Sequence, residues 1–322
     1  MKKVKRALFG LVVLLVFLAV SGCSRPAAST LSAGRQSRDP LSGLPFVSAK
    51  SWAIANGKTG KILWDYEGNK GRKAASTTKM MCAYVVLELV KKDPKVLDEI
   101  VTASKFAADT KGSTAKLKEG SKTSVGELLY GLLLPSGNDA GNALGEHFNH
   151  LFEPPTEEWI RNNPKYAERA SRNFVAEMNR TAIKLGMENT IYRIPYGDGG
   201  DATVYTTSAC DLLKLAYACM QNPRFRKYVN TREHQGVFTE QDGSNRELLW
   251  KHTNKLLAIE GFDGIKGGIT KLAGHCLVAS NHRDEDHLLM VVLGSSGDRA
   301  RYADTKNLYR WAWLERGHKK NK

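Results

Sequence analysis

The sequence of 322 residues has few cysteines, and none lies in the spacing that a zinc site needs. Its five cysteines stand at positions 23, 82, 210, 219 and 276, without a CxxC pair or a Cys/His pattern. Cys82, Cys210 and Cys219 fall in apolar helical patterns, where small buried thiols are more common than disulfides. We therefore expect no metal site, and free buried thiols are favoured over disulfides.

The first apolar run is too short to favour a membrane-spanning helix. It extends from Ala7 to Val20, and such a helix needs about 20 apolar residues. Four basic residues precede it and Ser21-Gly22-Cys23 follows, the pattern of an export signal. Residues 20–23 are similar to a bacterial lipobox, in which the cysteine is acylated and becomes the first residue. We predict a signal peptide over residues 1–22 and a lipidated Cys23; the alternative is an ordinary signal peptide with an incidental cysteine.

The signal segment also lacks acidic residues, so removing it with its four basic residues would lower the net charge from +15 to +11. A chain this basic favours anionic surroundings such as cell-wall polymer or lipid headgroups. Nucleic acid is not an expected partner outside the cytoplasm. The charge does not indicate a reaction type.

Residues 23–45 begin with the lipidated cysteine and continue as a flexible tether, because they are rich in Ser, Ala, Gly, Pro and Arg with little to bury. We expect one folded domain over residues 46–316 and a basic tail over residues 317–322. An apolar content of 42% and a charged content of 25% are typical of a globular protein. No internal repeat is visible.

Strand patterns at both ends of this domain enclose a middle, from about residue 95 to 260, that is predicted to be mostly helical. A turn at Asn56–Gly60 predicts a hairpin within residues 47–66, and the apolar run over residues 77–90 predicts a buried central helix. Further strands are expected at 262–269, 275–281 and 287–294, before a helix at 301–314. This order predicts an α+β fold with one antiparallel sheet, interrupted by a helical insertion.

Ser76-Thr77-Thr78-Lys79 places a hydroxyl and an amine on one face of the first turn of the buried helix. A lysine activates a serine only if its pKa falls well below the usual value of about 10.4. The start of an apolar helix offers that setting. Ser113–Lys116 has the same spacing, but polar sequence broken by Gly120 follows it, so we interpret it as a loop.

Two further motifs carry polar groups at chain breaks. Ser136-Gly137-Asn138 follows LLLP, where a sharp turn can expose a hydroxyl and an amide together; the alternative is a helix cap. Lys266-Gly267-Gly268 ends a strand, and its glycines let a ligand lie against the backbone. Lys58-Thr59-Gly60 is interpreted as the turn of the first hairpin.

In this order, the three motifs form the set found in penicillin-binding proteins and class A β-lactamases. The sequence also resembles the low-molecular-weight D-alanyl-D-alanine carboxypeptidase family, serine peptidases that trim peptidoglycan stem peptides, over about residues 47–315. The segments that carry the resemblance are KAASTTKMMCAYVVLELV, LLLPSGNDAGNALGEHF, FVAEMNRTAIKLGMENT and FDGIKGGITKLAGHCLVAS. It implies the β-lactamase/DD-peptidase (transpeptidase-like) fold, with a helical subdomain inserted into a sheet flanked by helices.

The resemblance further implies a covalent serine mechanism that needs no cofactor. Ser76 would attack the D-Ala-D-Ala carbonyl with Lys79 as its base, and Ser136 would relay a proton to the leaving amine. The backbone N–H groups of Ser76 and Ile269 would form the oxyanion hole. The residues expected to bind substrate are Asn138, Lys266, Gly267, Gly268, Ile269, Thr270 and Arg301. For Arg301, in DRARYAD, a helix surface charge is the alternative.

The sequence departs from the family at Gly267, where most members have threonine. The missing hydroxyl would weaken carboxylate binding by about 1–3 kcal/mol, unless another group compensates. Thr270 cannot be assumed to replace that contact. The chain also ends soon after its last helix, without the separate β-rich domain of many relatives, so lipid on Cys23 would supply the membrane attachment.

We therefore expect an exported lipoprotein that faces the periplasm or cell-wall space and is a D-Ala-D-Ala carboxypeptidase. Its partners would be stem peptides, β-lactams as covalent inhibitors, and a membrane, inner or outer. A D,D-endopeptidase is the alternative enzyme, and a wall-binding lipoprotein without turnover is the alternative motivated by Gly267. A β-lactamase is disfavoured because no E-x-x-L-N segment occurs, and Glu157 and Glu158 do not fit that pattern.

Overall fold

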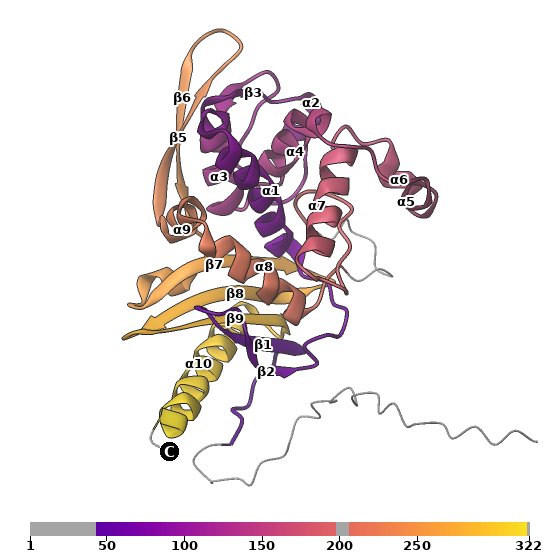
Figure 1. Ribbon diagram of the computed structural model, residues 1–322. Coiled ribbons are helices and arrows are strands. Elements are labelled where there is room, and N and C mark those ends of the chain that lie inside the picture. The colour runs from indigo at the N-terminus through magenta and orange to yellow at the C-terminus, as the bar shows by residue number, and fades with distance from the viewer. Residues whose placement is uncertain (1–42, 198–205, 321–322) are drawn as a thin grey trace, which may run out of the picture. The chain divides into compact units, whose positions relative to one another are not determined.

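The computed structural model describes residues 43–197 and 206–320 (Figure 1). The predicted signal peptide, Cys23 and the tether up to residue 42 lie outside the described residues. In the part of the chain that is described, no helix combines the length and the apolar character that crossing a membrane requires.

The first hairpin and the last three strands form one five-stranded antiparallel sheet, in the order β2-β1-β9-β8-β7 (Figure 1). Its strands are β1 Ser51–Asn56, β2 Ile62–Tyr66, β7 Phe262–Thr270, β8 Gly274–Arg283 and β9 Asp286–Ser295. Asn56 shapes the first hairpin, since its Oδ1 accepts hydrogen bonds from the backbone N of Lys58 at 2.8 Å and of Thr59 at 3.2 Å. The predicted sheet, built from distant parts of the chain, is confirmed, and so is the turn at residues 58–60.

Both faces of this sheet are covered, so its central strands are apolar on both sides. Trp52 and Ile54 on β1 pack with the last helix, α10 (Asp298–Lys320), whereas Ala53 and Ala55 point into the larger core on the other face. That larger core includes α8 (Ala209–Gln221), and Figure 1 shows α8 and α10 on opposite sides of the sheet. The alternation follows the period of two of an extended strand.

The buried central helix predicted over residues 77–90 is α1, Lys79–Lys92, and a 3-10 turn, η1 (Ala75–Thr78), precedes it. Side chains such as Met80, Val86 and Val90 are fully buried on it. The other helices of the described residues are α2 Lys105–Ala108, α3 Val125–Leu133, α4 Asn138–His147, α5 Glu157–Asn162, α6 Pro164–Ala167, α7 Arg172–Lys184 and α9 Pro223–Asn230. Further 3-10 turns are η2 Pro94–Asp98, η3 Asn149–Leu151 and η4 Lys255–Ala258.

The middle is mostly helical, as predicted, but a second, four-stranded sheet corrects the prediction of a single sheet. It consists of β3 Ile100–Thr102, β4 Lys122–Ser124, β5 Glu233–Thr239 and β6 Asn245–Lys251, in the order β3-β4-β5-β6. Only Gly236 and Phe238 are buried on β5, so its sequence is too polar to give a strong strand signal. The available signal was Asp242-Gly243, a pair typical of hairpin turns, and Gly243 has a φ of +83°.

The last helix and the cysteines also bear on what the sequence predicts. The last helix extends beyond the predicted 301–314, and residues 317–320 of the predicted tail continue it. Among the described residues, Cys82, Cys210 and Cys219 are buried free thiols, as the sequence favours, and so is Cys276. Burial raises the pKa of Cys82 to about 12, so this thiol remains protonated at neutral pH.

Candidate active site

The predicted Ser76-Lys79 pair lies at the start of α1. Ser76 belongs to η1, and Lys79 is the first residue of the α-helix, with a fully buried side chain. The amine Nζ of Lys79 donates hydrogen bonds to Ser76 Oγ at 2.9 Å and to the carbonyl oxygen of Tyr196 at 2.8 Å. It also donates to Asn138 Oδ1 at 2.7 Å. These acceptors hold the amine where, once neutral, it can take the proton of the serine hydroxyl.

A second serine-lysine pair lies opposite, on the turn before α4 and on β7. Ser136 has a φ of +67° and is buried, so the sharp turn directs its hydroxyl inward. Lys266 Nζ donates to Ser136 Oγ at 2.9 Å and to the carbonyl oxygen of Gly267 at 3.0 Å. Burial, with a smaller effect of the nearby Arg301 charge, lowers the pKa of Lys266 to about 7. Its neutral and charged forms therefore have similar populations near neutral pH.

Asn138 and Gly268 connect the two pairs. Asn138 lies two residues after Ser136, accepts from Lys79 and donates through Nδ2 to the carbonyl oxygen of Lys111 at 2.7 Å. A Cβ on Gly268 would lie 2.7 Å from the backbone N of Ser76, closer than packed atoms approach. Strand β7 therefore passes directly beside Ser76, and the structure brings the two hydroxyls and the two amines to one site.

The structure distinguishes among the other predicted binding residues on β7. Ile269 follows Gly268 and is half-exposed, so the backbone groups proposed for the oxyanion hole lie on adjacent segments. Thr270 Oγ1 accepts a hydrogen bond from the backbone N of Ala273 at 2.9 Å, within the turn to β8. Its hydroxyl therefore helps to shape the β7–β8 turn.

Arg301 is buried, which excludes the alternative of a helix surface charge. Its Nη2 donates to Asp298 Oδ1 at 2.7 Å, and its Nη1 donates to the carbonyl oxygen of Cys276 at 3.3 Å. A Cβ on Gly267 would lie 3.1 Å from Nη1. The guanidinium group therefore borders Gly267, the position where the resemblance leads us to expect a threonine.

Asp139 is a site residue that we did not predict. Its fully buried carboxylate accepts hydrogen bonds from Ala115 N at 2.8 Å, Thr114 Oγ1 at 2.6 Å and Leu117 N at 3.1 Å. It thus fixes the loop over residues 113–117 against α4. The loop in turn accepts from the backbone N of Asn138, through the Ser113 carbonyl at 2.8 Å. In the sequence, an acidic residue at this position indicated only an ordinary helix start.

The second S-x-x-K match, at residues 113–116, is a loop, as predicted, and it contributes backbone contacts to the site. The carbonyl oxygen of Tyr196 was also missed. A backbone acceptor carries no residue-type signal, because every residue has one.

The model of the family described as "D-alanyl-D-alanine carboxypeptidase" matches residues 39–150 and 165–297. A D-alanyl-D-alanine carboxypeptidase of Streptomyces sp. strain K15 is 32% identical over 291 residues, which cover 88% of this chain and 94% of the relative. The crystal structure titled Streptomyces K15 DD-transpeptidase superimposes with a TM-score of 0.73 at 31% identity, covering 84% of this chain and 99% of that chain.

Two other relatives are a longer carboxypeptidase and a protein named as an endopeptidase. D-alanyl-D-alanine carboxypeptidase DacC of Escherichia coli is 31% identical over 276 residues, which cover 84% of this chain but 62% of the relative. The chain therefore spans less than two thirds of that relative's length. A D-alanyl-D-alanine endopeptidase of Pseudomonas aeruginosa is 29% identical over 297 residues, which cover 90% of this chain and 85% of that protein.

Proposed function

Because the chain belongs to the D-alanyl-D-alanine carboxypeptidase family of serine peptidases, we propose that Ser76 is its nucleophile and Lys79 the base. The reaction is hydrolysis of the bond between the two terminal D-alanines of a peptidoglycan stem peptide. The observation that carries the assignment of roles is the 2.9 Å contact between the buried Lys79 Nζ and the partly exposed Ser76 Oγ.

In the first half of the proposed reaction, Ser76 Oγ attacks the carbonyl carbon of the D-Ala-D-Ala bond and its proton passes to Lys79 Nζ. The resulting oxyanion accepts hydrogen bonds from the backbone N–H groups of Ser76 and Ile269, each worth a few kcal/mol. Collapse of the intermediate breaks the C–N bond and releases D-alanine. Water then hydrolyses the ester on Ser76 and restores the hydroxyl.

Ser136 and Lys266 serve the leaving group in this proposal. Ser136 gives its proton to the departing amine and recovers one from Lys266, whose Nζ lies 2.9 Å from the Ser136 hydroxyl. A pKa of about 7 suits this exchange, because a group that titrates near the working pH both donates and accepts protons readily. The positive charge of Arg301, beside Gly267, faces the region proposed for the substrate carboxylate.

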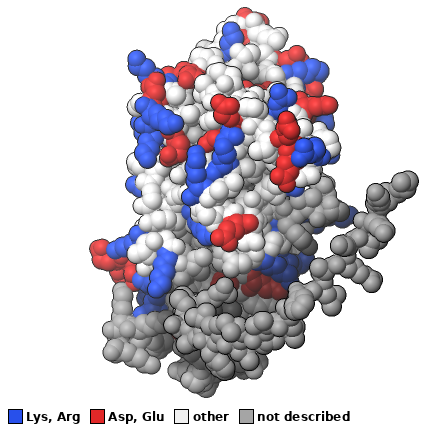
Figure 2. Space-filling view, turned by 45° about the vertical axis from the view of Figure 1, so that its right-hand side comes forward, with Lys and Arg blue, Asp and Glu red and all other residues white. Residues whose placement is uncertain are grey.

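A groove next to Asn138 has more basic than acidic lining residues, and this balance supports an anionic peptide substrate. It has a volume of about 440 Å³, and Lys111, Lys116, Lys118 and Arg246 line it together with Asp109. Glu240 forms ion pairs with two of the basic residues, Lys118 and Arg246. The carbonyl oxygen of Lys111, one of the lining residues, accepts from Asn138 Nδ2, so one wall of the groove contacts a residue proposed to bind substrate. Figure 2 shows basic and acidic side chains interspersed on the visible face, so the excess positive charge does not form one uniform patch there.

The proposed roles predict that Ser76→Ala lowers the release of D-alanine from diacetyl-Lys-D-Ala-D-Ala by at least about a thousandfold, because no nucleophile remains. Ser113→Ala is the matched control, since it removes the hydroxyl of the second S-x-x-K match and keeps the backbone carbonyl that accepts from Asn138 N. The full-length Ser113→Ala protein should release D-alanine at the wild-type rate. Equal losses in both variants, or wild-type release by the Ser76 variant, would contradict the assignment.

The alternative of a D,D-endopeptidase is tested on the same protein, and the Pseudomonas aeruginosa relative is the reason to test it. A crosslinked stem-peptide dimer and a pentapeptide are offered together, and the products are identified by mass spectrometry. The carboxypeptidase assignment predicts preferential loss of the terminal D-alanine. Preferential cleavage of the crosslink would replace it with the endopeptidase, and folded protein without either product would favour the wall-binding lipoprotein.

Gly267 predicts a gain of function by substitution. Gly267→Thr restores the hydroxyl next to Arg301 and should lower the KM for diacetyl-Lys-D-Ala-D-Ala about tenfold, the value of one hydrogen bond to a charged group. The new Cβ requires a small shift of Arg301, from which it would lie 3.1 Å. Gly267→Val has the same shape without the hydroxyl, so it should show no gain. Equal KM values for the two variants would refute the missing contact.

We also propose that lipid on Cys23 anchors an exported protein to the membrane, with the domain facing the periplasm or cell-wall space. The basic start, the apolar run and the lipobox-like residues 20–23 support this proposal. Mass spectrometry of the mature N-terminal peptide should find Cys23 first in the chain and carrying lipid, and Cys23→Ala should move the protein out of the membrane fraction. An N-terminal peptide with an unmodified Cys23 would end the proposal.

A further inference from the structure

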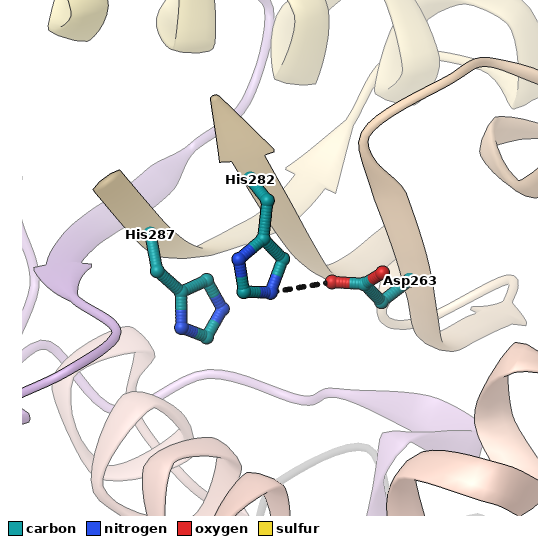
Figure 3. A group of neighbouring side chains, drawn as sticks. All are labelled: Asp263, His282 and His287. Carbon is teal, nitrogen blue, oxygen red and sulfur yellow. Dashed lines mark ion pairs between the residues drawn. The ribbon is translucent and has the colours of Figure 1, made fainter. Parts of the chain in front are cut away.

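Three potential metal ligands meet at one end of the large sheet (Figure 3). Asp263 comes from the start of β7, His282 from the end of β8 and His287 from the start of β9. His282 and His287 are cross-strand partners beside the β8–β9 hairpin. One ligand atom from each of the three side chains lies within 4.8 Å of the others.

The three side chains already interact closely. His282 Nε2 lies 2.8 Å from Asp263 Oδ2, the contact drawn in Figure 3. Ser280 Oγ donates to Asp263 Oδ2 at 3.0 Å and contacts His287 Nε2 at 2.8 Å. The two imidazole rings are stacked, with centroids 3.9 Å apart. Two imidazole nitrogens and a carboxylate oxygen thus lie close together, with a hydroxyl beside them. Because the nitrogen lone pairs of stacked rings point side by side, the half-exposed ring of His282 must turn for both rings to bind one ion.

The backbone fixes this arrangement. The ring of His287 is packed so closely against Gly57 that a Cβ there would lie 2.1 Å from Nδ1. Gly57 N also donates to the carbonyl oxygen of His287 at 2.8 Å, and His282 N donates to that of Gly261 at 2.7 Å. His287 is buried, whereas half of the His282 side chain is exposed. The group is therefore held in place on one side and open to solvent on the other.

The chemistry of these groups selects the kind of ion. Imidazole binds Zn²⁺ and neighbouring transition metals well, whereas Ca²⁺ and Mg²⁺ prefer oxygen ligands only. Zn²⁺ commonly takes three protein ligands and completes a tetrahedron with water. A metal at this position would replace the protons that now connect the carboxylate, the hydroxyl and the rings.

We propose that Asp263, His282 and His287 form a binding site for Zn²⁺ or a similar transition-metal ion, with both Nε2 atoms and Oδ2 as ligands. The ion would join β7, β8 and β9 at the end of β7 opposite Gly268, so its role is to stabilise the sheet. This departs from the sequence expectation of no metal, because ligands on three strands leave no local Cys/His spacing. The site is independent of the proposed peptidase roles.

Zinc binding to the full-length protein tests the site, with Zn²⁺ alone as the titrant in calorimetry and Co²⁺ as a coloured probe. The wild type should bind one equivalent and unfold at a higher temperature with Zn²⁺. His282→Gln should weaken binding at least about tenfold and abolish the temperature shift. His150→Gln is the matched control, because this exposed histidine lies on η3 and outside the group. It should behave as the wild type.

Asp263→Asn is the second variant, in case His282→Gln fails to fold, and circular dichroism checks both. It keeps the shape of the side chain but removes the charge, so it should also weaken binding. Wild-type protein without stoichiometric binding, or unchanged affinity in both folded variants, would overturn the proposal. Labelling of Ser76 by a fluorescent penicillin in the same samples separates this outcome from a failure of the peptidase assignment.

Discussion

The proposed chemistry depends on one interaction, the hydrogen bond from the buried amine of Lys79 to the hydroxyl of Ser76. A buried lysine is costly unless acceptors surround it. Asn138 and the carbonyl oxygen of Tyr196 provide acceptors here. The other features of the site follow from this need. Asp139 holds the loop that supports Asn138, and Gly268 lets β7 approach the serine.

Ser136 and Lys266 form a second pair in which a buried lysine amine donates to a serine hydroxyl. Lys266 is buried on β7, and its lowered pKa follows from that burial, with a smaller effect of the Arg301 charge. The large sheet thus supplies one amine and the helical region supplies the other. Arg301 is the charged group that borders Gly267, where the resemblance leads us to expect a threonine.

The features that depend on local spacing in the sequence were predicted. The features that depend on contacts between distant segments were missed. Ser76 and Lys79 were predictable because helical geometry places residues three apart on one face. Strand β5 was missed because most of its side chains are exposed and polar. The burial of Asp139 and the meeting of Asp263 with His282 and His287 require contacts between distant segments. The sequence pattern contains no signal for such contacts.

The most direct test of the Ser76-Lys79 pair is to identify the residue that a β-lactam acylates. The full-length protein is incubated with penicillin and digested, and the peptides are mapped by mass spectrometry. The account predicts a single adduct on Ser76, formed far more slowly when Lys79 is replaced by methionine. An adduct on another residue, a folded wild type without adduct, or an equal rate in the Lys79→Met protein would contradict it.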